Sequence, residues 1–430
     1  MILLIYCFLV RAGVGLWLAF ERPREFVAVD GAEYLDTARN IVSGRGYSIS
    51  SPRPWDWESY QPARTSEEQH RPRVEVFRPP LYSIALAALL AVVPNGLWPI
   101  ALLDALLSTA AGWFLFDLGR RALASVAGQI GLLFYASYPL AVALGAKIGA
   151  EPLFELFLCA SVWALWRTRE TGRTGFALVA GLFLGLATLT RSNSIFLWPC
   201  ACVWLALFAR QNRLAAAWFT LLLFLTMLPW AARNRLQTGH WIFLSGSGGY
   251  NFWLGNNETA YRMFTARSSE EYDRWGKMLL QEIVPQKARL IGTSDVAIAQ
   301  QFWYDEAKGF IKNNPGLWLR LLAAKAVEFW RPYLRPLFFP RSLVILSALT
   351  TLPLLILGWW GIILLFRGCP AFAWLLLLVV ISGMTGLVLS HVHVRLRVPF
   401  VDTFFCVSSG FALASCWKKR PPDRSPSPDR

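Results

Sequence analysis

Long apolar runs recur along the chain and indicate its architecture. Most extend for roughly 17–25 residues with at most one charge, enough at 1.5 Å per helical residue to cross a hydrocarbon core about 30 Å thick. Two further runs hold ionisable residues: 1–20 contains Arg11, and 150–166 contains Glu151 and Glu155. The pattern predicts an all-α polytopic membrane protein with about ten transmembrane helices. The clean runs are 98–116, 124–144, 174–190, 194–209, 214–232, 343–366, 371–390 and 399–416.

Composition supports a membrane location, and the charge distribution suggests an orientation. The chain is 55% apolar and 16% charged, against about a quarter charged in an average soluble domain. A formal charge of +15 raises the possibility of a nucleic-acid partner, but the basic residues gather in short loops, as they do on the cytoplasmic side of membrane proteins. We therefore expect no nucleic acid and both termini inside. The basic loops are Arg120-Arg121, Arg167 to Arg173, Arg210 to Arg213, Arg367 and Lys418-Lys419-Arg420.

One apolar run, 81–93, is about seven residues too short for a comfortable span. Counting it as a crossing would put Arg120-Arg121 and every later basic loop outside. We therefore predict an interfacial or re-entrant helix on the outer side. Four parts follow: an N-terminal transmembrane module, 1–232, which includes a first outer loop, 21–97; a second outer loop domain, 233–342; C-terminal transmembrane helices, 343–416; and a basic cytoplasmic tail, 417–430.

The first outer loop begins with candidate acids directly beyond the first span. Helical spacing puts Asp30, Glu33 and Tyr34 on one face, and 33–42 is predicted to form a short helix that ends at Ser43-Gly44. The alternative is a solvated helix start with an acid stabilising its N-terminus. Between the ends of the loop, 48–75 is rich in Pro, Arg and Glu and is interpreted as irregular.

A double proline marks the other end of this loop. Pro79 and Pro80 favour an extended entry to the short helix, so that Arg78 lies at the level of the lipid headgroups. There its planar guanidinium can hold a phosphate. The alternative is a purely interfacial contact by Arg78 and Tyr82.

The order of the motifs resembles the GT-C glycosyltransferases, in particular the branch that holds dolichyl-phosphate-mannose protein mannosyltransferases and lipid A aminoarabinose transferases. The first outer loop carries three such motifs and later segments carry five more, which together cover almost the whole chain. They are Asp30-Gly-Ala-Glu-Tyr34, Gly44-Arg-Gly-Tyr47, Arg78-Pro-Pro-Leu-Tyr82, Ala150-Glu-Pro-Leu-Phe154, Gly185-Leu-Ala-Thr-Leu-Thr-Arg191, Pro229-Trp-Ala-Ala-Arg-Asn234, Ser247-Gly-Gly-Tyr-Asn-Phe-Trp-Leu-Gly-Asn-Asn257 and Arg395-Leu-Arg-Val-Pro399.

The resemblance implies an inverting transfer of a sugar from a polyprenyl-phosphate donor at the outer face of a bacterial cell membrane. The acceptor is a glycan, a lipid or a protein, and membrane lipids surround the site. The role of general base carries over to Asp30, and partial desolvation is expected to raise its pKa towards useful basicity. Glu151 matches a second acidic position close to that aspartate, where it either orients the base and acceptor or, with Asp30, binds Mg²⁺ or Mn²⁺. The alternative for Glu151 is an ion pair with Lys147.

The phosphate of the leaving group requires cations. The candidates are Arg78, Arg191, Arg395 and Arg397, with Arg233 in addition, and each is also a candidate for a lipid-headgroup contact. Substrate contacts are expected from Glu33, Tyr34 and Tyr82, although Glu33 stands where the aminoarabinose branch carries a basic residue. His391 and His393 precede the last arginine pair, and their i, i+2 spacing would make them diverge on a helix.

The second outer domain begins with a glycine-rich segment, 245–257. Tyr250 and Asn251 lie within it and suit sugar stacking and hydroxyl recognition, while a tight turn with interfacial aromatics is the alternative. The spacing is neither that of a P-loop nor that of a dinucleotide site. Residues 269–333 are predicted to be mostly helical, with a break at 313–316.

Two other classes compete with a glycosyltransferase. A polymerase or ligase of surface polysaccharide would share the lipid-linked donor and the large outer loops. A lipid-sugar transporter should carry ionisable or helix-broken sites near mid-membrane, and often internal repeats. The sequence indicates neither, because the polar candidates cluster at one face.

Overall fold

Six helices of the computed structural model are long and apolar enough to cross a membrane, or seven if one bent pair counts as a single span. The structure describes residues 1–417 except 28, 52, 54–71 and 336–339. The predicted basic tail therefore lies almost wholly outside the described residues. The six are α1 (Ile2–Glu21), α6 (Trp98–Ala122), α12 (Ala215–Thr238), α19 (Arg341–Gly368), α20 (Pro370–Leu389) and the composite Val394–Cys416, built from α21 (Val394–Arg397), η4 (Val398–Asp402) and α22 (Thr403–Trp417).

The other four predicted spans are also helical. The bent pair is α7 (Ser125–Ser137) and α8 (Pro139–Gly145), whose axes differ by 61°. α9 (Glu151–Thr171) has 21 residues but carries several charges, while α10 (Thr174–Thr188) and the stretch Ser192–Phe208, made of η2 (Ser192–Phe196) and α11 (Leu197–Phe208), are shorter apolar helices. The all-α polytopic fold is confirmed, and the count of ten spans is approximate.

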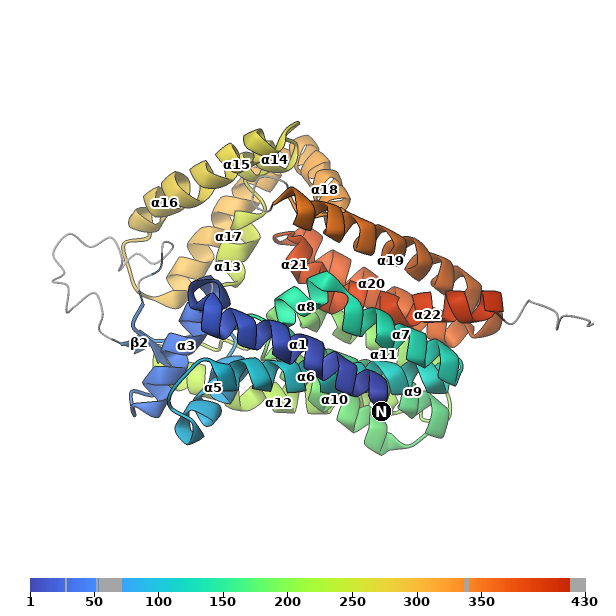
Figure 1. The fold of residues 1–430 in the computed structure, drawn as a ribbon. Helices are drawn as coiled ribbons and strands as arrows, with labels where there is room; N and C mark the ends of the chain where they lie inside the picture. The colour runs from blue at the N-terminus through green and yellow to red at the C-terminus, as the bar shows by residue number, and fades with distance from the viewer. Residues whose placement is uncertain (28, 52, 54–71, 336–339, 418–430) are drawn as a thin grey trace, which may run out of the picture.

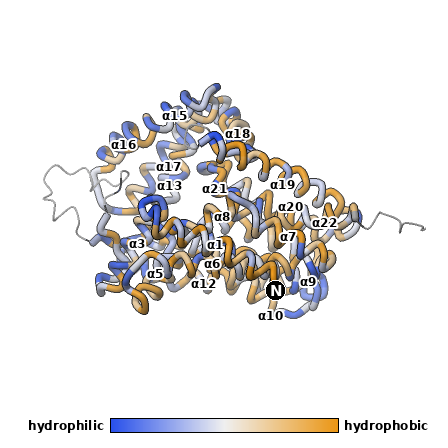
Figure 2. The backbone as a smooth tube through the Cα atoms, viewed as in Figure 1, coloured by the Kyte–Doolittle hydropathy of each residue, from blue (hydrophilic) through white to orange (hydrophobic). Residues whose placement is uncertain are grey.

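Two groups of shorter elements lie outside these spans (Figure 1). The first outer loop forms α2 (Pro23–Val27), α3 (Val29–Val42), the two-stranded antiparallel pair β1 (Ser48–Ile49) and β2 (Arg73–Val74), and α5 (Leu81–Val92). The second outer loop forms α13 (Gly248–Leu254), α14 (Glu258–Phe264), α15 (Ser269–Lys277), η3 (Met278–Ile283), α16 (Val284–Ile291), α17 (Val296–Asn313) and α18 (Pro315–Phe329). Hydrophilic residues are frequent within α3 and within α15 to α17, whereas the spans consist mostly of hydrophobic residues (Figure 2).

The short elements match the sequence expectations in most places. The helix predicted over 33–42 is α3, which ends before Gly44 in the left-handed region at φ +77°. The short apolar run is α5, and its position at the membrane surface stays a prediction. The helical prediction for 269–333 and the break at 313–316 are confirmed by α17 and α18. The glycine-rich segment forms the helix α13, where a turn was the alternative.

The basic loops and the outer loops lie at opposite ends of the bundle. Arg121 pairs with Glu170 at 3.7 Å, and Asn212 donates a hydrogen bond to Thr174 at 3.1 Å, so three of the predicted cytoplasmic loops meet. At the other end of α12, Arg233 donates to the carbonyl of Tyr47 in the first outer loop. The 24 residues of α12 separate the two ends by about 36 Å. This arrangement agrees with the predicted topology, whose orientation in the cell stays a prediction.

Ionisable side chains are buried inside the spans, which corrects one expectation. Arg11 is fully buried, donates to the carbonyl of Tyr135 at 2.9 Å, and lies 4.3 Å over the ring of the same tyrosine. The Tyr135 hydroxyl donates to Glu155 at 2.6 Å. Together with the bend between α7 and α8, this network shows that the spans do contain ionisable and helix-broken sites. The absence of such sites can no longer be used against a transporter.

Candidate active site

Asp30 lies at the first turn of α3, and its place is fixed by the glycine that follows it. A Cβ on Gly31 would lie 2.7 Å from the carbonyl oxygen of Ile148, in the turn between α8 and α9. The amide of Ile148 donates in turn to the carbonyl of Phe26 at 3.0 Å, just before α3. Backbone therefore packs on backbone here, and Asp30 is held beside the start of α9, where Glu151 lies.

Two buried tyrosines, Tyr34 on α3 and Tyr82 on α5, pack these two helices together. Tyr34 and Tyr82 are 4% and 0% exposed, and their rings meet edge to face at 5.2 Å. The Tyr82 hydroxyl donates to Asp104 at 2.9 Å and accepts the amide of Gly149 at 3.2 Å. Both were predicted to contact substrate. The structure instead buries them between α3, α5 and α6, where they have almost no surface to offer a ligand.

Three arginines surround the two predicted catalytic carboxylates. Arg78 donates to Asp30 at 2.7 Å, and Arg191 donates to Glu151 at 2.6 Å. Arg395 donates to both: to the second oxygen of Asp30, and from Nε to Glu151 at 2.7 Å. Residues about 120 and 365 positions after Asp30 are thereby brought to one point. The ion pair between Glu151 and Lys147, which was the alternative, is replaced by these pairs.

The arginines alter the acidity of Asp30 in the direction opposite to the expectation. Burial by itself would raise the pKa of Asp30, but the positive charges of Arg78 and Arg395 outweigh it. The pKa of Asp30 is therefore held well below its ordinary value, and the prediction of a raised pKa is wrong for this arrangement. In this structure Asp30 is a paired carboxylate, and its lowered pKa makes it a weak base.

A buried ion cluster holds Arg78 from the other side. Arg78 Nε donates to Glu33 at 3.0 Å, and Arg53 donates to the same Glu33 oxygen at 2.7 Å and to Glu75 at 2.5 Å. Arg53 and Glu75 were not predicted as site residues, because the Pro-, Arg- and Glu-rich stretch between them has no spacing that selects either. Glu33 was predicted to bind substrate, and the structure shows it 7% exposed and committed to the two arginines.

Two predicted phosphate ligands have structural partners instead. Arg397 is fully buried with Asp402, to which it donates at 2.8 Å, and it also donates to the carbonyls of Phe329 and Arg331. It has no surface through which to reach a phosphate in this structure. Arg233 donates to the backbone carbonyls of Tyr47 and Glu75, both at 2.7 Å, and so fastens the first outer loop to α12.

The glycine-rich segment reaches this region through one aromatic contact. Tyr250 on α13 is 5% exposed, with its ring 5.4 Å from Trp303 and 6.0 Å from Phe77, the residue before Arg78. Asn251 is exposed and donates to the Ser247 hydroxyl at 3.0 Å. Their predicted contact with substrate stays a prediction.

The carboxylates do not fit a divalent cation as they are arranged. Within the described part of the chain, no three side chains of His, Cys, Asp or Glu converge into a metal-binding group. Asp30 and Glu151 already pair with three arginines, so a divalent ion bound by both carboxylates would have to displace Arg395 from them. His393 accepts the amide of Arg395 through Nδ1 at 3.1 Å and caps α21, and burial lowers its pKa to about 3.

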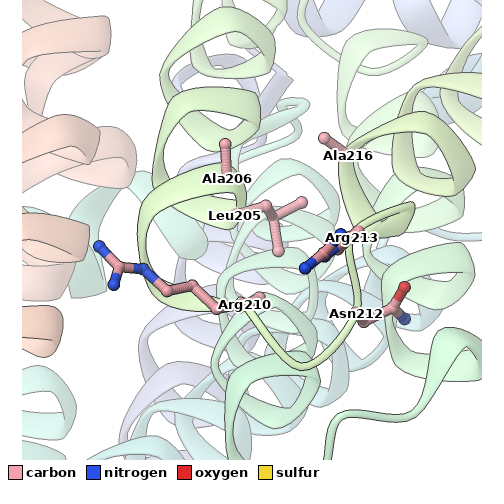
Figure 3. A pocket seen from close by; sticks show the side chains of 7 residues that line it. Leu205, Ala206, Arg210, Asn212, Arg213 and Ala216 are labelled. Carbon is pink, nitrogen blue, oxygen red and sulfur yellow. The ribbon is translucent and has the colours of Figure 1, made fainter.

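A separate cavity of about 340 Å³ lies at the turn between α11 and α12, at the other end of the bundle. Arg210 and Arg213 line it beside Asn212 (Figure 3). None of the predicted site residues lines this cavity.

Comparison with known proteins assigns the fold. Residues 77–232 match the family model described as dolichyl-phosphate-mannose-protein mannosyltransferase. A crystal structure of the Archaeoglobus fulgidus oligosaccharyltransferase with Zn and sulfate matches with a TM-score of 0.56 and 15% identity, over 96% of this chain and 49% of that chain. The fold is that of a GT-C glycosyltransferase. No curated protein matches in sequence.

Two further solved structures are similar to this chain. Archaeoglobus fulgidus AglB in complex with an inhibitory peptide and a dolichol-phosphate gives a TM-score of 0.53 at 15% identity, over 97% of this chain and 50% of that chain. ArnT from Cupriavidus metallidurans bound to undecaprenyl phosphate gives 0.44 at 12% identity, over 98% and 81%. The chain spans about half the length of the archaeal oligosaccharyltransferases. The resemblance identified in the sequence is thus confirmed at the level of the fold.

Proposed function

We propose that this protein is an inverting membrane glycosyltransferase, which moves a sugar from a polyprenyl-phosphate donor to an acceptor hydroxyl at the outer face of a bacterial cell membrane. The observation that carries the proposal is the meeting of Asp30, Glu151 and three arginines in a GT-C fold. A carboxylate that can accept a proton thus lies next to arginines that can bind a phosphate. AglB with dolichol-phosphate offers a precedent for a lipid phosphate on this fold.

The donor itself would activate the base. Arg78 and Arg395 hold the pKa of Asp30 low by their charge. A donor phosphate that binds these arginines competes with Asp30 for them, and the pKa of Asp30 then rises towards the value that burial favours. Substrate binding therefore converts a paired carboxylate into a usable base.

The reaction follows from this exchange of partners. Asp30 takes the proton of the acceptor hydroxyl as its oxygen attacks the anomeric carbon from the face opposite the phosphate. The bond between that carbon and the phosphate oxygen breaks, and its electron pair stays on the phosphate, where Arg78 and Arg395 stabilise the charge. Glu151 positions Arg395 and Arg191, and Glu33 positions Arg78.

Two alternatives share parts of this description. Mg²⁺ or Mn²⁺ bound by Asp30 and Glu151 would require Arg395 to leave both carboxylates, and adding either ion to metal-free protein tests that directly. A polysaccharide polymerase or ligase would use the same donor and base but a glycan acceptor. Product analysis by mass spectrometry separates it from transfer to lipid or protein.

The test is Asp30→Asn in the full chain, reconstituted in nanodiscs with a panel of polyprenyl-phosphate sugars and a membrane extract as acceptor source. Loss of the base should lower the transfer rate roughly 10²- to 10⁴-fold. Asp305→Asn, an exposed aspartate on α17, makes the same chemical change and should keep the wild-type rate. Transfer by Asp30→Asn at the rate of that control would reject Asp30 as the base.

A further inference from the structure

A second cationic cavity is lined by residues other than those of the proposed active site. It encloses about 850 Å³ between the segment that joins α14 to α15 and the C-terminal turn of α18. Figure 1 shows these helices together at the N-terminal end of α19, a candidate span. Three arginines line the cavity, Arg267, Arg331 and Arg335, against one acid, Glu328, which leaves two positive charges in excess.

The arginines of this cavity are only partly satisfied. Arg331 and Arg335 share the single carboxylate of Glu328, at 2.7 and 2.8 Å. The Nε atom of each is buried and has no hydrogen-bond partner among the described residues. Arg335 lies 3.2 Å over the ring of Tyr272, which holds its guanidinium plane in place. Three guanidinium groups face one carboxylate in this lining, which leaves donors that the cavity can offer to an anion.

The wall of the same cavity is apolar and faces outward. Val327 is 75% exposed and Tyr333 is 40% exposed, and Phe264 and Trp330 also line the cavity. Cations beside exposed apolar groups at the entrance to a membrane span suit a ligand with an anionic head and a hydrocarbon tail. Arginine in particular matches phosphate, because its fork donates two parallel hydrogen bonds.

One short helix joins the cavity to the catalytic carboxylates. Arg395 and Arg397 both lie on α21: Arg395 donates to Asp30 and Glu151, and Arg397 donates to the carbonyls of Phe329 at 2.6 Å and Arg331 at 3.0 Å. One four-residue helix thus contacts both the Asp30 cluster and the backbone at the cavity.

We propose that this cavity binds the phosphate of a membrane lipid, at a site separate from the Asp30 and Arg78 cluster. The chemistry required is a phosphate monoester or diester on a long hydrocarbon chain. A polyprenyl phosphate fits it, and that choice of chain rests on the proposed function, whereas the binding site itself does not. Such a site would hold the lipid carrier next to the base before or after transfer.

Binding can be measured without any sugar transfer, so its failure is distinct from failure of the glycosyltransferase proposal. The intact protein in detergent is titrated with undecaprenyl phosphate, with phosphatidic acid and with inorganic phosphate, and bound lipid is counted by native mass spectrometry. Each lost arginine contact should weaken lipid binding roughly 10- to 100-fold in Arg331→Gln and Arg335→Gln. Arg320→Gln removes an exposed charge from α18 and should bind as wild type does.

Glu328→Gln gives a result of opposite sign. It frees the guanidinium donors that Glu328 occupies, so lipid phosphate should bind more tightly. If the ion pairs are merely structural, this variant weakens binding as the arginine variants do, and the proposal is overturned. Exposed Arg267 can be changed without disturbing the fold, and Arg267→Gln should weaken binding about threefold to tenfold.

Comparing the two lipids with inorganic phosphate identifies which kind of phosphate the cavity binds. Preference for undecaprenyl phosphate supports a carrier site, and equal binding of phosphatidic acid supports a general lipid-phosphate site. Binding of inorganic phosphate alone, or lipid binding that none of the arginine substitutions changes, overturns the proposal.

Discussion

Gly31→Ala should displace α3 and with it Asp30. The new methyl group would lie 2.7 Å from the carbonyl oxygen of Ile148, about 0.7 Å short of the 3.4 Å at which ordinary contact begins. Neither partner yields easily, because the oxygen belongs to backbone and the Ile148 amide is already bonded to Phe26. Overpacking of this size costs about 1–3 kcal/mol, against a gain of up to about 1 kcal/mol from alanine in a helix. With a cost of about 2 kcal/mol, the middle of that range, the net loss is about 1–2 kcal/mol.

Thermal unfolding in detergent, followed by the fluorescence of the 21 tryptophans, measures this loss. A loss of that size should lower the midpoint by roughly 1–4 °C. The matched control is Gly309→Ala on α17, where a Cβ meets nothing within 4 Å, and this variant should be as stable as wild type or more so. If Gly31→Ala unfolds no earlier than that control, the close contact that we infer between α3 and the α8–α9 turn is absent.

Three further outcomes follow from buried or capping groups. Arg397→Met should lower the free energy of unfolding by about 3–5 kcal/mol because it leaves Asp402 buried without its cation, and the double variant with Asp402→Leu should recover most of the loss in thermal unfolding. Asn257→Ala removes the side-chain cap of α14 and the bond that its amide donates to the Trp253 carbonyl, so it should cost about 0.5–2 kcal/mol in thermal unfolding. Burial lowers the pKa of Lys325 to about 7, so between pH 7 and about 10.4 the unfolded chain holds a proton that the folded chain releases. Stability should therefore rise with pH across that window, and Lys325→Met should flatten the rise in midpoints measured from pH 6 to 9.

The sequence predicted the helices better than the partners of their charges. α3 and α5 follow from periodicity and run length, and both appear close to where they were expected. The pairing of Asp30 with Arg395 depends on how the last span packs against the first loop, and only the resemblance brought the two together in advance. Arg53 lies in a stretch whose composition is uniform, so nothing in the sequence distinguishes it.

One error could have been avoided from the sequence alone. Residues two apart on a helix point to different sides, and this spacing argues against a metal shared by His391 and His393. The same rule applies to Arg395 and Arg397, which face the carboxylates and the buried Asp402 respectively. The expected rise in the pKa of Asp30 failed for another reason: partial desolvation was expected, whereas the pairing of Asp30 with two arginines was not.

The bond between Asp30 and Arg395 has a consequence for biosynthesis. The two residues are 365 positions apart, so Arg395 must leave the ribosome before the pair can form. Until then Asp30 and Glu151 lack the cation that they share, although each of them is made early. The cluster is thus completed only when α21 is made, and a chain that stops before residue 394 has both carboxylates but lacks Arg395, which pairs with each of them.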